Sequence, residues 1–143
     1  KYLGTKMFKL DYLIICQSII FPKFYTVKDN GNNEYVFLKT GEKEIHSLNV
    51  VNDKTQLEGY ENHFHLFGKV KKCYQKKARI VIELITQNLI KELKQTYPNK
   101  KFRVYLDCDF SDHVIIRFHQ QWHDEHSYYD VAEFPSITEF IID

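Results

Sequence analysis

The sequence contains few of the residues that are abundant in disulfide-rich extracellular proteins, fibrous proteins and proteins with structural metal sites. It holds only three cysteines, at Cys16, Cys73 and Cys108, an odd number without a CxxC pair. This argues against a disulfide framework and against a structural zinc site. Five glycines and three prolines exclude a collagenous or low-complexity chain. We therefore expect three reduced, mostly buried thiols in a cytoplasmic protein.

Long apolar runs are also missing. The longest, Leu10–Phe21, contains polar residues and is too short to span a bilayer, and no cleavage site follows it, so we expect no membrane partner. Within it, Leu13–Phe21 predicts a buried strand, with a short helix as the alternative. The single methionine is Met7. We expect translation to start there and residues 1–6 to be an added remnant, although a start further upstream is equally allowed.

The composition that is present belongs to a folded chain. Hydrophobic residues make up 43% of the sequence and include ten tyrosines and eleven phenylalanines, which excludes a disordered protein. A chain of 143 residues is one domain long and can bury a core without a disulfide or a metal. We predict a single domain over residues 1–143 with no cofactor.

Alternation of apolar and polar residues predicts several strands. The first two, Phe24–Lys28 and Glu34–Lys39, flank Asp29–Asn33, whose composition suits a hairpin loop. Short turns between consecutive strands indicate an antiparallel meander. The same pattern predicts further strands over Glu44–Val51, His63–Val70, Phe102–Phe110, Val114–Trp122 and Ile137–Ile142, and loops over Asn52–Lys54 and His123–Pro135.

One segment changes to the helical period. In Lys76–Tyr97 the apolar residues recur at i, i+3, i+4 and i+7, which predicts one amphipathic helix of about five or six turns. Pro98 ends it. The sequence therefore predicts an α+β fold, a mostly antiparallel sheet with one long amphipathic helix packed on a face.

The charges are distributed unevenly along the chain. Residues 1–106 carry 19 lysines and arginines against 10 acids, whereas residues 107–143 carry one arginine against nine acids. The net charge of +1 excludes nucleic-acid binding through bulk positive charge alone.

Bulky aromatic residues lie among the C-terminal acids. Acids steer a cationic partner toward a surface, and Trp and Tyr anchors slow its release. We therefore predict a partner-binding surface for a basic protein, formed by Asp107, Asp109, Asp112, Trp122, Asp124, Glu125, Tyr128, Tyr129 and Asp130. The alternative is that the acids face water or pair with lysines of the same chain.

Basic residues crowd around the expected helix and supply a second hypothesis. The cluster, with Tyr74 and Tyr97 interleaved, could follow a phosphate backbone, which would make the chain a nucleic-acid-binding module. A solvated helix face explains the same pattern, and no RNA- or DNA-binding signature accompanies it. The basic residues concerned are Lys69, Lys71, Lys72, Lys76, Lys77, Arg79, Lys91, Lys94, Lys100, Lys101 and Arg103.

Two clusters raise a third hypothesis, a metal-dependent hydrolase. Asp107, Asp109 and Asp112 form D-x-D-x-x-D, which could hold magnesium. His119, His123 and His126 form H-x3-H-x2-H, which does not match the metalloprotease spacing. An Asp-rich hairpin turn and a polar loop explain both, so we predict neither a metal site nor an enzyme.

The C-terminal part resembles a known class. The stretches Phe102–Leu106, Ile116–Gln120 and Tyr128–Asp130, in a small α+β chain, resemble immunity proteins of bacterial toxin systems, including contact-dependent growth inhibition. The resemblance transfers no residue roles, because immunity proteins share no common fold. It implies a cytoplasmic protein that binds its cognate toxin and performs no chemistry. Such toxins are often nucleases with basic clefts, which an acidic aromatic face would cover.

Overall fold

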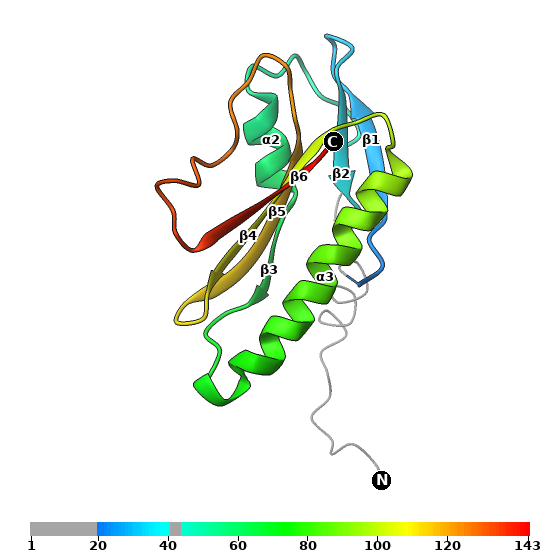
Figure 1. Cartoon of the computed structure of the whole chain (residues 1–143). Helices are drawn as coiled ribbons and strands as arrows, with labels where there is room; N and C mark the ends of the chain where they lie inside the picture. Colours follow the sequence, from blue (N-terminus) through cyan, green and yellow to red (C-terminus); the bar gives the residue numbers. More distant parts are fainter. Residues whose placement is uncertain (1–19, 41–43) are drawn as a thin grey trace.

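The computed structural model describes residues 20–40 and 44–143 and confirms the α+β fold (Figure 1). The described helices and strands follow one another along the chain as β1 (Phe24–Lys28), β2 (Glu34–Leu38), α2 (Lys54–Glu61), β3 (His63–Phe67), the 3-10 turn η1 (Lys72–Tyr74), α3 (Gln75–Thr96), β4 (Phe102–Asp109), β5 (His113–Gln120) and β6 (Ile137–Ile142).

The strands form two antiparallel sheets. β1 and β2 pair as the expected hairpin, and Asn32 in their turn takes a left-handed backbone conformation, with φ of 64°. The other four strands lie in the order β3-β5-β4-β6. The meander prediction is therefore wrong for β3, which pairs with β5 rather than with its neighbours in the sequence. The long α3 connection allows this, because it returns the chain to the far side of β5.

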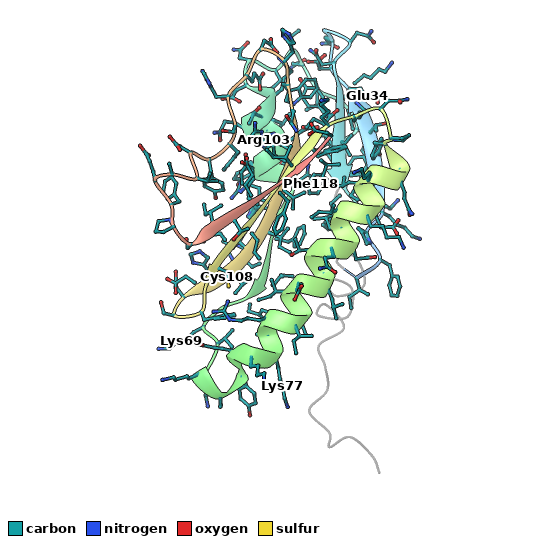
Figure 2. All side chains as sticks on the ribbon, in the orientation of Figure 1. Glu34, Lys69, Lys77, Arg103, Cys108 and Phe118 are labelled. Carbon is teal, nitrogen blue, oxygen red and sulfur yellow. The ribbon has the colours of Figure 1, made fainter. Side chains whose placement is uncertain are left out.

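The main core lies between α3 and the four-stranded sheet. α3 crosses one face of the sheet, as the sequence predicted (Figure 1), and its buried residues recur every three or four positions. Leu89 and Leu93 meet Phe102, Val104 and Phe118 in one apolar cluster. Figure 2 labels Phe118 on β5 in this layer. The burial of these side chains is the largest apolar contribution to folding.

Two sequence predictions between β2 and β3 are wrong. Residues 44–51 form no strand; their apolar side chains, including Leu48, pack on the outer face of the β1–β2 hairpin instead. The predicted Asn52–Lys54 loop contains the start of α2. Asp53 caps this helix, since its Oδ1 accepts a hydrogen bond from the Gln56 amide at 2.8 Å. Asp53 and Gln56 have the spacing of a capping box, which is the signal that would have revealed α2.

Other expectations concern the thiols and the first apolar stretch. Cys73 is exposed in η1 and Cys108 is half-buried, so the expectation of mostly buried thiols is wrong for Cys73. Cys16 and all but the last two residues of Leu13–Phe21 lie outside the described residues. Among the described helices, none is long and apolar enough to cross a bilayer.

Leu89 and Leu84 on α3 allow a direct test of this core. Leu89 is 1% exposed whereas Leu84 is 61% exposed. We expect Leu89→Ala to lower the free energy of unfolding by about 2–5 kcal/mol, because it leaves a cavity, and Leu84→Ala to change it by less than about 0.5 kcal/mol. Urea denaturation of both variants checks this. Equal losses would mean that α3 packs on the sheet through another face.

Candidate functional site

A buried carboxylate, Glu58 of α2, lies where the two sheets meet. Its Oε1 accepts hydrogen bonds from the Val36 amide at 2.7 Å and the Gln120 side-chain amide at 2.6 Å. Its Oε2 accepts from the Gln120 backbone amide at 2.8 Å and from Trp122 Nε1 at 3.2 Å. One side chain therefore joins α2, β2, the end of β5 and the following loop.

Two amide side chains near Glu58 also form hydrogen bonds with the backbone of β2. Asn62 accepts from the Leu38 amide at 2.9 Å and donates to the Val36 carbonyl at 2.8 Å. Gln120 donates to the Glu34 carbonyl at 2.9 Å. These side chains satisfy the free edge of β2 as a neighbouring strand would. We call Glu58, Asn62 and Gln120, which share this role, the polar seam.

Burial controls the protonation of Glu58. The loss of solvent raises the pKa of its carboxyl to about 7, and the donated hydrogen bonds limit the increase. No lysine or arginine forms an ion pair with Glu58 among the residues the structure describes. Neutral donors, rather than a counter-charge, therefore hold this carboxylate.

Glu125, one of the predicted partner-binding acids, binds the amino end of α2. Its two carboxylate oxygens accept from the backbone amides of Lys54 at 2.9 Å and Thr55 at 2.6 Å. The ammonium of Lys54 lies 2.8 Å from the same carboxylate. An acid at this position satisfies free amides and complements the helix dipole. Glu125 is therefore part of the scaffold.

Arg117 of β5 holds the other end of α2. It donates to the carbonyl of Gly59, and its guanidinium lies 4.1 Å from the ring centre of Tyr128 and 5.5 Å from that of Tyr129. Arg117 is 9% exposed, and no carboxylate pairs with it in residues 20–40 and 44–143. The faces of the two tyrosine rings attract the guanidinium, as a carboxylate partner otherwise would.

Gly59 is required for this arrangement. A Cβ at this position would overlap the ring of Tyr128. Only glycine lets the ring lie directly against the α2 backbone. The sequence pattern predicted no helix here, and therefore gave no role to either Gly59 or Glu58.

The predicted aromatic anchors are therefore used inside the molecule. Trp122 donates to Glu58 and packs on Tyr35, with ring centres 5.3 Å apart. Tyr129 packs on Tyr105 at 5.3 Å and on Tyr128 at 4.8 Å. These contacts fix the loop after β5 across the sheet face opposite α3.

The three aspartates at the β4–β5 hairpin lie together, as expected. Asp107 accepts from Ser136 at 2.7 Å and contacts His113 Nε2 at 3.0 Å. Asp109 accepts from the Ser111 hydroxyl at 2.6 Å, and Asp112 contacts His113 Nδ1 at 2.9 Å. The two aspartates around His113 raise its pKa. This is the hydrogen bonding of an Asp-rich turn.

The remaining acids divide into paired and unpaired groups. Asp124 lies 3.3 Å from Lys54. Arg103 pairs with Glu139 at 2.6 Å, and Lys101 with Asp143 at 3.2 Å. Within the described part of the chain, the C-terminal acids without a lysine or arginine partner are Asp107, Asp109, Asp112, Asp130 and Glu133, which we call the acidic edge.

The histidine cluster does not converge. His119 is buried under the loop, where its Nδ1 donates to the Gln120 carbonyl at 2.6 Å and its Nε2 lies 3.3 Å from the Tyr105 hydroxyl. Burial lowers the pKa of His119. His123 and His126 are exposed. No group of three or more His, Cys, Asp or Glu side chains suited to a metal ion occurs in the part of the chain described.

Comparison with known proteins identified no relative. No family model matches the sequence, and neither a curated protein nor a solved structure matches it.

Glu58 generates a prediction on pH dependence. Because its folded-state pKa of about 7 lies above its ordinary 4.5, protonation favours the folded state. The stabilisation of the folded state that comes from protonating Glu58 is complete below pH 4.5. It is lost as the pH rises through 7. In denaturation measured across this range, the wild-type free energy of unfolding should fall relative to that of Glu58→Gln by about 3 kcal/mol.

The matched control is Glu61→Gln, an exposed position one turn further along α2. It should keep the wild-type pH profile. If Glu58→Gln and wild type have parallel profiles, Glu58 is not the buried titrating group.

The contact of Gly59 with Tyr128 generates a second prediction. Gly59→Ala should push the ring away and lower stability by about 1–3 kcal/mol, as overpacking does. Gly68→Ala is the control, because the nearest atom to its added Cβ is 3.8 Å away. Thermal melts and the aromatic circular dichroism signal report both effects. A Gly59→Ala protein as stable as wild type would contradict the close packing.

Proposed function

We propose that this chain is a binding protein that neutralises a cationic protein partner by direct stoichiometric contact, in the manner of a cytoplasmic immunity protein acting on its cognate toxin. The supporting observation is the acidic edge, five carboxylates without lysine or arginine partners in the described structure. Asp107 and Asp112 form ion pairs with His113, whereas Asp109, Asp130 and Glu133 have no ion pair in the described structure. Acids that are not neutralised within the molecule attract an external cation.

The acidic edge is held by short-range hydrogen bonds. Ser136 joins the loop before β6 to Asp107, and the Cys108 amide donates to the Ser136 carbonyl at 3.0 Å. Asp130 accepts from the Ala132 amide at 3.1 Å. A surface whose side chains are already ordered by hydrogen bonds loses little conformational entropy on binding, which favours affinity.

Internal contacts reduce the number of predicted residues that remain free to touch the partner. Trp122, Glu125, Tyr128 and Tyr129 make internal contacts, so their role in binding is to hold the loop. Asp112 and Asp130 are exposed and remain able to contact a partner. Phe134, which is 45% exposed and packs on Tyr129 at 5.8 Å, supplies an aromatic contact beside them.

The physical role of the acids in this proposal is steering. A single-sign patch accelerates encounter with an oppositely charged surface, and the effect declines with salt because the screening length is about 8 Å at physiological ionic strength. Binding that covers a toxin's basic cleft would exclude its substrate, and no reaction on this chain is needed.

The proposal predicts that the gene beside that of this chain encodes the cognate toxin, and the test uses the protein encoded there. We expect Asp112→Lys with Asp130→Lys to slow association with that toxin at least about tenfold at low salt and to weaken growth rescue on co-expression. Glu61→Lys with Glu83→Lys is the matched control, since both positions are exposed acids outside the acidic edge.

Stopped-flow association and a growth assay measure these effects. Full rescue and unchanged association by the Asp112→Lys, Asp130→Lys protein would remove the acidic edge as the interface. An equal loss in the control would show that only net charge matters.

A further inference from the structure

A second charged surface lies at the end of the molecule where β3 leads into α3. The chain from Lys69 to Arg79 carries six cations and no acid. Figure 2 shows Lys69 and Lys77 at this end. All six are exposed, and none forms an ion pair with an acid among the described residues. We call Lys69, Lys71, Lys72, Lys76, Lys77 and Arg79 the basic end.

These cations oppose the local electrostatics of the helix. α3 has 22 residues, no side chain caps its amino end, and its first turn contains no acid. A helix amino terminus carries partial positive charge and favours acids, so the lysines there are unfavourable. Lys76 and Arg79, both within α3, add like-charge repulsion at three-residue spacing. A local arrangement that costs stability without a compensating contact is typical of a binding site.

An apolar groove opens beside these cations. It lies between the β3–η1 connection and the start of α3 and has a volume of about 730 Å³. Its floor includes Leu66, Phe67, Val70 and Val81, and Val81 is 43% exposed. Lys69, Lys71 and Lys77 also line it. Apolar surface and cations without an ion pair in the described structure therefore lie side by side in this groove.

We propose that this groove docks an acidic amphipathic segment of a partner protein. Apolar side chains of that segment would lie on the Leu66, Val70 and Val81 floor, and its carboxylates would meet the lysines that line the groove. The groove follows α3 from Tyr74 to Val81, which is about 10 Å at the helical rise. Two apolar anchors one helical turn apart fit this length.

The chemistry of the groove favours a protein segment over other anions. Aliphatic side chains form most of the floor, and Tyr74 and His65 are the exposed rings beside them, whereas single-stranded nucleic acid is held by several stacked aromatic residues. A concave groove also matches a convex peptide better than a flat bilayer surface. The cations supply charge complementarity, and the floor supplies the apolar contact area.

The groove borders the acidic edge but has the opposite charge preference. The Val70 amide donates to the Phe110 carbonyl at 2.9 Å, and the guanidinium of Arg79 lies 4.8 Å from the Phe110 ring centre. The β4–β5 hairpin, which carries Asp107, Asp109 and Asp112 of the acidic edge, therefore lies directly against the groove. The groove does not depend on the proposed neutralisation of a cationic partner, because its ligand is acidic.

The test titrates three probes into the full chain. They are a helix-forming peptide with leucines one turn apart among glutamates, the same peptide with serines for leucines, and a single-stranded RNA oligomer. The variants are Lys69→Glu with Lys77→Glu, and Val81→Ser. The matched charge control is Lys91→Glu with Lys94→Glu, further along α3 and exposed. Circular dichroism confirms folding, and isothermal titration gives the affinities.

We expect the leucine peptide to bind, the serine peptide to bind at least about tenfold more weakly, and both groove variants, but not the control, to lose about tenfold in affinity. Failure of the leucine peptide to bind overturns the proposal. Tighter RNA binding that is lost with the Lys69, Lys77 variant and kept by Val81→Ser also overturns it, in favour of a nucleic-acid surface. Preference for anionic phospholipid vesicles over the peptide overturns it as well.

Discussion

The structure depends on one buried carboxylate that meets four hydrogen-bond donors. Glu58 ties the β1–β2 hairpin to the four-stranded sheet, because its donors come from Val36 on one side and from Gln120 and Trp122 on the other. Among the residues that the structure describes, no strand pairs with this edge of β2, and Glu58 and Asn62 of the polar seam satisfy its backbone instead. Removing Glu58 would leave several buried donors without partners, which costs more than the loss of one ordinary hydrogen bond.

This constraint divides the C-terminal residues between structure and surface. Glu125, Tyr128 and Arg117 hold the two ends of α2, the helix that presents Glu58. Acids without a lysine or arginine partner in the described structure form the acidic edge, and three of them lie on the β4–β5 hairpin, which contacts Val70 and Arg79 beside the basic end. The molecule therefore shows two neighbouring surfaces of opposite charge, and a protein that binds at both would be held in a single orientation.

The sequence predicted the elements whose periodicity is continuous. The α3 stripe and the alternation in β4, β5 and β6 follow directly from burial of one face, and the hairpin follows from its turn residues. The short α2 was missed because its apolar pattern is weak and its stability comes from partners distant in sequence, such as Glu125 and Arg117. For the same reason, charge and aromatic content could not show that Trp122 and Tyr128 point inward: Gly59 and Glu58, which receive them, are more than 60 residues away in sequence.

The most direct test of this account is an NMR titration of the Glu58 side-chain carboxyl carbon in the full chain, with the amides of Val36 and Gln120 followed in the same samples. The account predicts a midpoint near pH 7 for the carboxyl carbon and for both amides, because one proton affects both sheets. A midpoint near 4.5, or amides that do not follow the carboxyl, would show that Glu58 is solvated and that the polar seam does not join the two sheets.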